Sequence, residues 1–191
     1  MFIEFQNEWF KPDGKLRQFL IEDDIAFQKA VNHEEKLLTL CREKNAHIFH
    51  VTLSPDPTYK VFGSAEFGLR AMIPLAGTWK DDSQDIHATF LPLPGELVVR
   101  ERTGASVSSG SMLDSVLRNN GINTLYLAGF ETHICIESTL REAHDRGCNC
   151  YVVTDATAAF NTFQQEYFEK EILNHFGKRV TTENILAEVN A

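Results

Sequence analysis

Strand-like and helix-like runs alternate along most of this chain, and that alternation limits the possible folds more than any other feature. The runs expected to form strands are 1–5, 47–53, 97–102, 123–129 and 148–156. The runs with helical periodicity or helix end signals are 25–44, 111–121, 133–147, 163–176 and 181–189. Strands separated by helices form βαβ units. We therefore predict a three-layer α/β/α fold with a mostly parallel, Rossmann-like sheet of about six strands.

The stretch 54–96 interrupts this alternation. It is rich in proline and carries no clear helix or strand pattern, so we expect irregular cover over one end of the sheet. A length of 191 residues with 43% hydrophobic residues suits one core, and we predict a single domain over residues 1–191. The first expected strand begins at residue 1 with almost no lead-in, which is compatible with a native start upstream of Met1.

The charge of the chain argues against several classes of partner. Its net charge is −9, so it has no basic stripe for nucleic acid or for an acidic membrane surface. An anionic small substrate stays possible, because a pocket can be locally positive. No apolar run approaches the roughly 18 residues of a membrane span, and the acidic start MFIEFQNEWF is no signal peptide.

The four cysteines show no spacing typical of a disulfide framework. We therefore expect a cytoplasmic protein with reduced thiols. Cys148 and Cys150 alternate in an expected strand and would face the same side of it, which favours a structural role over a redox pair.

Three reactive side chains follow expected strands. Glu4 ends the first strand, Arg102 ends the run 97–102, and Cys135 comes just after the run 123–129. A parallel sheet gathers loops and helix N-termini at the carboxyl ends of its strands, and ligands bind there. We therefore predict that these three side chains share one rim.

Cys135 is placed where a strand passes into a helix. Thr132 can cap that helix with its hydroxyl, which puts Cys135 in the first turn. The unpaired N–H groups and the helix dipole there favour a thiolate and could hold an oxyanion. The position suits a nucleophile. Spacing alone leaves open a second interpretation, a small buried residue at a helix start.

Three motifs resemble those of the isochorismatase-like cysteine hydrolases, which include nicotinamidases and carbamoyl amidohydrolases. GFETHIC, followed by a helix ending in Gly147 and by Asp155-Ala156, is similar to the family's Gly-x-x-Thr-x-x-Cys core. IEFQNEWF resembles its opening Ile-Asp-x-Gln-Asn-Asp-Phe, and RTGASVSSGSML fits Lys-x-x-x-Ser-x-Phe-x-Gly-Thr-x-Leu without gaps. The matches span nearly the whole chain in the right order, and they imply the family's fold.

The resemblance implies a catalytic Asp, Lys and Cys. By position the Cys is Cys135, the Asp is replaced by Glu4, and the Lys is replaced by Arg102. Choosing Arg100 instead would need a two-residue insertion. Glu4 keeps a carboxylate for proton transfer. Arg102 keeps a positive charge but does not deprotonate, so a role that requires a neutral amine would be lost. Without the resemblance, Glu4 and Arg102 would be read as ordinary solvated charges.

The resemblance also assigns neighbouring residues to substrate or oxyanion binding. Phe130, Glu131, Thr132 and His133 form the turn before Cys135, and the family often has a non-proline cis peptide there, at Phe130–Glu131 in this chain. His133 either contacts substrate or faces the surface.

Four further positions follow from the other two motifs. Gln6 and Asn7 match a pair that ties the end of the first strand to neighbouring backbone. Ser106 and Ser108 match a family serine and a usually aromatic pocket residue, so Ser108 should widen the pocket or make it more polar.

We predict no metal and no cofactor. Nicotinamidases of this family bind a metal through Asp-x-His and a further His, but the corresponding loop LSPDPTYKVFG has no histidine. His47 and His50 are three apart in an expected strand and point to opposite faces. His87 lies in an acidic run that we interpret as a solvated loop.

The leading hypothesis is hydrolysis of a small amide or carbamoyl compound through a thioester on Cys135. The alternative is a small-ligand-binding member of the same fold without catalysis, because two of the three catalytic residues are replaced. Vinyl ether hydrolysis is a third interpretation, disfavoured because it does not depend on a cysteine. The resemblance implies a homodimer or homotetramer acting on a small molecule, while the net charge argues against a nucleic-acid or membrane partner.

Overall fold

The computed structural model describes residues 1–189, and a sheet of six parallel strands in the order β3-β2-β1-β4-β5-β6 lies at its centre. The strands are β1 (Phe2–Ile3), β2 (Phe49–Val51), β3 (Leu97–Val99), β4 (Thr124–Phe130), β5 (Asn149–Ala158) and β6 (Lys178–Val180). The predicted α/β class and parallel sheet are confirmed. β6 is the one strand of this sheet whose range the sequence did not indicate.

The central strands are buried on both faces. β4 is buried from Leu127 to Phe130, and β5 consists largely of β-branched and small residues such as Val152 and Val153, both 0% exposed. Such near-continuous apolar runs are typical of parallel strands covered by helices on each side. In register, Leu127 pairs with Val152 across β4 and β5, and Phe2 pairs with Ala128 across β1 and β4.

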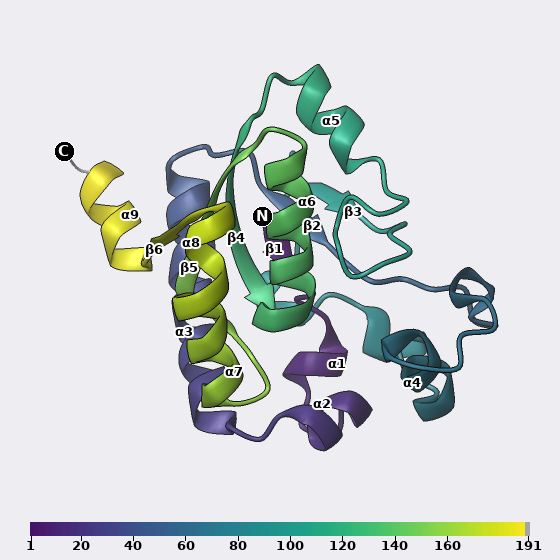
Figure 1. The fold of residues 1–191 in the computed structure, drawn as a ribbon. Coiled ribbons are helices and arrows are strands. Elements are labelled where there is room, and N and C mark those ends of the chain that lie inside the picture. Colours follow the sequence, from purple (N-terminus) through teal and green to yellow (C-terminus); the bar gives the residue numbers. More distant parts are fainter. Residues whose placement is uncertain (190–191) are drawn as a thin grey trace.

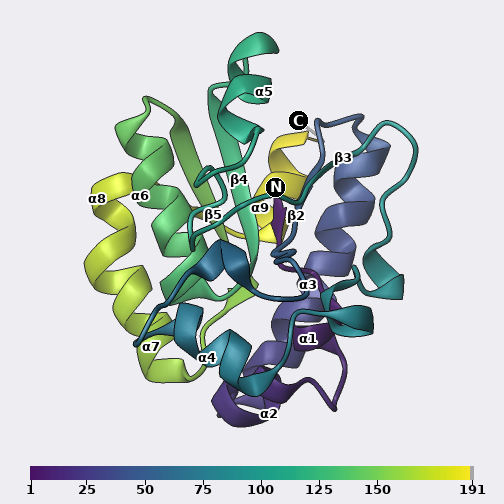
Figure 2. The ribbon, with the colours of Figure 1, turned by 90° about the vertical axis from the view of Figure 1, so that its right-hand side faces the viewer.

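Helices cover both faces of the sheet (Figures 1 and 2). Figure 2 shows α3 (Asp24–Glu43) and α9 (Thr182–Val189) on one side of the sheet. On the other side lie α6 (Glu137–Asp145), α7 (Thr162–Tyr167) and α8 (Leu173–Phe176). Two hydrophobic cores result, one on each face.

The remaining helices are α1 (Asn7–Phe10), α2 (Lys15–Leu20), α4 (Leu69–Ala76) and α5 (Leu113–Asn119). α3 begins after Asp23, whose Oδ1 accepts a hydrogen bond from Ala26 N at 2.9 Å and so satisfies one unpaired donor of the first turn. Its buried face includes Phe27, Val31 and Leu38, at the spacing expected of a helix on a sheet.

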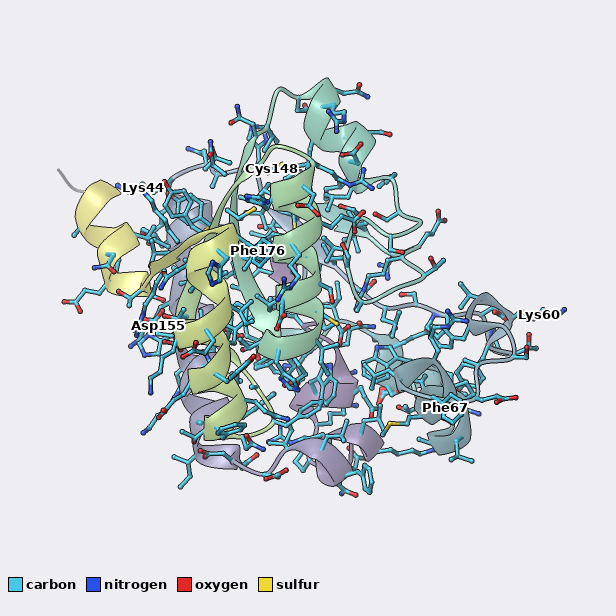
Figure 3. The ribbon with its side chains drawn as sticks, viewed as in Figure 1. Lys44, Lys60, Phe67, Cys148, Asp155 and Phe176 are labelled. Atoms are coloured by element: carbon cyan, nitrogen blue, oxygen red, sulfur yellow. The ribbon has the colours of Figure 1, made fainter. Side chains whose placement is uncertain are left out.

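The stretch 54–96 is more regular than the sequence indicated. It contains α4 and three 3-10 turns, at 60–62, 81–84 and 88–90. Figure 1 shows the α4 segment standing out from the side of the sheet, and Figure 3 shows Phe67 on that segment. The periodicity of LRAMIPLA was obscured because Pro74 lies inside the helix.

No helix within residues 1–189 combines the length and the hydropathy needed to cross a lipid bilayer.

Candidate active site

The candidate site lies where the strand order reverses, between β1 and β4. The chain adds β2 and β3 on one side of β1, and β4, β5 and β6 on the other. Loops that leave the carboxyl ends of two such strands diverge and leave a crevice between them. Glu4 directly follows β1, and Cys135 lies in the π-helical turn η4 (Thr132–Ile136) that follows β4.

The close approach of β1 to β4 depends on Gly129. A Cβ at this position would lie 2.1 Å from the carbonyl oxygen of Ile3, and φ of Gly129 is +118°. Any side chain would therefore push the two strands apart. Glu4, the next residue after Ile3, has φ of 62°, an uncommon conformation for a non-glycine residue, and its N–H donates to Val51 O at 2.8 Å. The end of β1 is thus held closely against both of its neighbours.

The structure brings the three predicted side chains into direct contact. Cys135 Sγ donates a hydrogen bond to Glu4 Oε1 at 3.0 Å. Arg102 Nη2 forms an ion pair with the same oxygen, and Arg102 Nη1 lies 3.5 Å from the sulfur. All three residues are buried, with Cys135 the most exposed at 6%. Arg100, the competing choice from the sequence, is exposed.

Further hydrogen bonds satisfy the buried charges. Trp9 Nε1 donates to the second oxygen of Glu4, Oε2, at 2.7 Å. Arg102 Nη1 donates to the carbonyl oxygens of Gly104 at 3.1 Å and Ala105 at 2.8 Å. Such bonds matter because a buried ion pair is stable only when its remaining donors and acceptors find partners. A carboxylate in contact with a thiol can take its proton, so the group is arranged for nucleophilic chemistry.

The turn that precedes Cys135 has the cis peptide that was expected but not the expected helix cap. The Phe130–Glu131 peptide bond is cis, as the resemblance implied. Thr132, however, does not cap the helix. It is the first residue of η4, Glu131 takes the cap position without a side-chain bond, and the Thr132 hydroxyl is buried with no hydrogen-bond partner in the described part of the chain. Cys135 still lies in the first turn of this helical segment.

A cavity of about 330 Å³ opens onto the reactive group. Glu4, Arg102, Cys135 and Glu131 lie in its lining, together with Arg70 from α4. The apolar part of its wall comes from segments far apart in the sequence: Trp9, Leu53, Phe62, Phe67, Leu69, Ile73, Trp79, Ile134 and Phe160. Sequence reasoning missed these residues. Only Trp9 among these lies within a motif that the sequence analysis used, IEFQNEWF.

The other predicted site residues lie outside this lining. Phe130 is 0% exposed and stacks on Phe27, with ring centroids 4.2 Å apart, so it belongs to the core. His133 is partly buried, and its ring lies nearly perpendicular to that of Phe160, with ring centroids 4.7 Å apart. It therefore lies behind the cavity wall. Burial lowers the pKa of His133.

Ser106 and Ser108 lie in a turn of their own. Ser106 Oγ accepts from the N–H of Ser108 at 3.3 Å, while the cavity is lined by Thr103, Gly104 and Ala105 from the same loop. The expected effect of Ser108 on the pocket therefore has no counterpart in this geometry.

Gln6 and Asn7 tie the end of β1 to the segment 54–96. Gln6 Oε1 accepts from Leu53 N at 2.7 Å, and its Nε2 donates to Leu53 O at 2.8 Å and to Gln84 O. Asn7 Nδ2 donates to Asp82 O at 2.9 Å. These bonds fix the position of the segment that supplies one wall of the cavity.

Two buried acids lie close to the turn. Glu34 of α3 and Glu131 are at most 1% exposed, and neither carboxyl group has a hydrogen-bond partner within residues 1–189. Burial raises the pKa of both groups well above the usual range, and the charge of Glu131 raises the pKa of Glu34 further. Both therefore retain their protons to a higher pH than a solvated carboxyl group does.

The histidines are spread out. His50 is buried with Nε2 2.7 Å from Glu96 Oε2, His47 is exposed, and His87 stacks on Phe10. Among residues 1–189, no three His, Cys, Asp or Glu side chains are grouped so that they could hold a metal ion.

The chain is similar in sequence to a known protein family and to several curated proteins. A family model described as the isochorismatase domain matches residues 1–184. The ureidoacrylate amidohydrolase RutB of Caulobacter segnis is 29% identical over 172 residues, which cover 81% of this chain and 70% of that protein. Several further curated relatives match over less than two thirds of their own length.

Two solved structures share the fold. An isochorismatase family protein from Desulfovibrio vulgaris superposes with a TM-score of 0.83 at 21% identity, covering 100% of this chain and 96% of that chain. N-carbamoylsarcosine amidase from Thermoplasma acidophilum has a TM-score of 0.70 at 22% identity, covering 95% and 94%.

Proposed function

This chain belongs to the isochorismatase family of hydrolases, and we propose that it hydrolyses the C–N bond of a small amide or carbamoyl compound with Cys135 as the nucleophile. One observation carries the proposal, the 3.0 Å hydrogen bond from Cys135 Sγ to Glu4 Oε1 at the base of a cavity. Two of the relatives are named as an amidohydrolase and an amidase, which supports the choice of a C–N bond.

In the first half of the reaction, Glu4 takes the proton of Cys135 as the sulfur attacks the carbonyl carbon. Arg102 Nη1, 3.5 Å from the sulfur, stabilises the negative charge there. Backbone N–H groups at the start of η4 are the proposed donors to the oxyanion. The C–N bond then breaks, the leaving nitrogen takes the proton from Glu4, and a thioester remains on Cys135.

In the second half of the reaction, water is the nucleophile and the sulfur is the leaving group. Glu4 takes a proton from a water molecule, whose oxygen attacks the thioester carbonyl. The C–S bond breaks, the acid leaves, and the sulfur regains a proton from Glu4. Trp9 keeps Glu4 in place throughout, because its N–H holds Oε2 while Oε1 faces the sulfur. Arg102 remains charged, so it acts by position and charge alone.

The test compares three proteins with the wild type on a panel of primary amides and N-carbamoyl compounds, with ammonia release as the readout. We expect Cys135→Ala to abolish turnover and Glu4→Gln to lower kcat by roughly 10²- to 10⁴-fold, the usual value of a general base. Cys148→Ala is the matched control, since Cys148 lies beyond the far end of α6 (Figure 3). Equal rates for wild type and Cys135→Ala would contradict the proposal.

A second candidate function is binding without turnover. The observation in its favour is the direct ion pair between Arg102 and Glu4 Oε1, the oxygen that must accept the proton of Cys135. A strongly held carboxylate is a weaker base. On this alternative, the wild type binds amides but releases no ammonia, and iodoacetamide alkylates Cys135 no faster than it alkylates a free thiol.

A further inference from the structure

The wall of the cavity differs in character from its base. Glu4, Arg102 and Cys135 are grouped at the base. The rest of the lining is mostly aromatic and aliphatic, with side chains such as Trp9, Phe62, Trp79 and Phe160, and Arg70 and Glu131 are its ionisable members. The volume of about 330 Å³ is at the small end of the roughly 300–1,000 Å³ usual for small-molecule sites. A ligand therefore has one polar end at Cys135 and a compact remainder in contact with hydrocarbon.

The polar atoms of the wall are mostly occupied. The indole N–H of Trp9 donates to Glu4, and that of Trp79 donates to Gln6 Oε1 at 3.3 Å. Arg70 is exposed, and its Nε and Nη2 both donate to the carbonyl oxygen of Phe62. Few groups are left to replace the water that a polar substituent would lose on entry.

The carboxyl group of Glu131 is a further polar group of the lining that a ligand cannot reach. Glu131 lines the cavity, but both carboxyl oxygens are buried and have no hydrogen-bond partner in the described residues. Burial raises the pKa of this carboxyl group well above the usual range, so it holds its proton more strongly than a solvated acid. Because both oxygens are buried, Glu131 presents no accessible polar atom to a ligand in the cavity.

We infer that the substrate is an uncharged amide whose acyl group is compact and apolar, an aryl or branched alkyl group, and not the polar, ionised chain of a ureido acid. This inference rests on the proposed function, because it assumes that the amide carbonyl lies at Cys135. The physical cause is the difference between the two ends of the cavity: an apolar acyl group gains by leaving water, while an ionised one loses its hydration without replacement.

Both tryptophans of the chain line the cavity, so their fluorescence reports binding without any need for turnover. The experiment titrates Cys135→Ala protein with acetamide, isobutyramide, phenylacetamide and N-carbamoylglycine. We expect affinity to rise by about fourfold for each added methylene, and by more for the phenyl group. N-carbamoylglycine should bind no better than acetamide. Tighter binding of N-carbamoylglycine than of phenylacetamide, lost on Arg70→Gln, would overturn the inference.

Two wall variants and one control make the test specific. Phe160→Asn and Leu69→Asn, both at partly exposed positions of the wall, should each weaken phenylacetamide binding by roughly tenfold and leave acetamide unchanged. Leu75→Asn is the control, because Leu75 is 90% exposed on α4 and lies outside the lining. If Leu75→Asn weakens phenylacetamide as much as the wall variants do, the apolar group does not bind in this cavity.

The outcomes separate the two proposals. Selective binding of apolar amides to Cys135→Ala, without turnover by the wild type, contradicts the hydrolase function but supports the ligand class. Turnover of ureido acids in preference to apolar amides supports the hydrolase function and contradicts the ligand class.

Discussion

Replacing Gly129 with alanine should disable the site without touching any of its reactive side chains. The new Cβ would lie 2.1 Å from Ile3 O, whereas ordinary contacts begin near 3.4 Å. Relieving the clash requires β1 and β4 to separate by about 1.3 Å, since both partners are buried backbone. Glu4 follows Ile3 directly, so its 3.0 Å hydrogen bond to Cys135 Sγ should be lost.

The magnitudes follow from two separate effects. Overpacking costs roughly 1–3 kcal/mol and the positive φ roughly 1–2 kcal/mol for a residue with a Cβ, so we expect a free energy of unfolding lower by about 2–5 kcal/mol. A displacement of about 1 Å at a reacting group lowers the rate by roughly 10²-fold. We therefore expect kcat/KM for amide hydrolysis to fall by about that factor.

Gly147→Ala is the matched control. Gly147 also has a positive φ, +85°, but a Cβ there meets no atom within 4 Å. The strain of a Cβ at this φ should lower the free energy of unfolding by only roughly 1–2 kcal/mol, and the activity should stay that of the wild type. Urea unfolding followed by fluorescence and ammonia release measure the two quantities. If Gly129→Ala and Gly147→Ala are alike in both, the spacing of β1 and β4 does not position Glu4, and the reasoning fails.

Two further predictions concern buried polar groups. The folded-state pKa of Glu34 is raised well above 4.5, so the native protein binds an extra proton and loses stability as pH rises above that value. Glu34→Gln should therefore be more stable than wild type at pH 8, with the difference shrinking toward pH 4, whereas exposed Glu35→Gln should show no such trend in Tm. Gln6→Ala leaves the N–H and C=O groups of Leu53 without their hydrogen-bond partner. Urea unfolding should therefore show a free energy of unfolding lower by about 2–4 kcal/mol. The control Gln18→Ala, at an exposed position, should lower it by less than about 0.5 kcal/mol.

The topology of a parallel sheet predicted that Glu4, Arg102 and Cys135 lie at one edge, while the family resemblance was needed to choose Glu4 and Arg102 over an interpretation as solvated charges. Each of these residues follows a strand whose alternation with helices could be read directly, and the carboxyl ends of such strands share one edge. Arg102 lies three residues beyond the end of β3, so even an imprecise strand boundary did not affect the outcome.

The cavity wall could not be predicted in the same way. Phe62, Ile73 and Trp79 reach the site through a segment whose course depends on long-range bonds from Gln6, and no local pattern encodes that course. The same limit applies to β6, whose three residues are too few to show periodicity. Thr132 looked like a helix cap by residue type, but the helical turn begins one residue earlier than that role requires.

The most direct test of a cysteine nucleophile is the intact mass of the protein during turnover. Wild-type protein mixed with phenylacetamide and quenched in acid within the first turnovers should carry one acyl group, located on the peptide that contains Cys135, and Cys135→Ala should carry none. Ammonia release without such an adduct, or an adduct on another cysteine, would contradict the account.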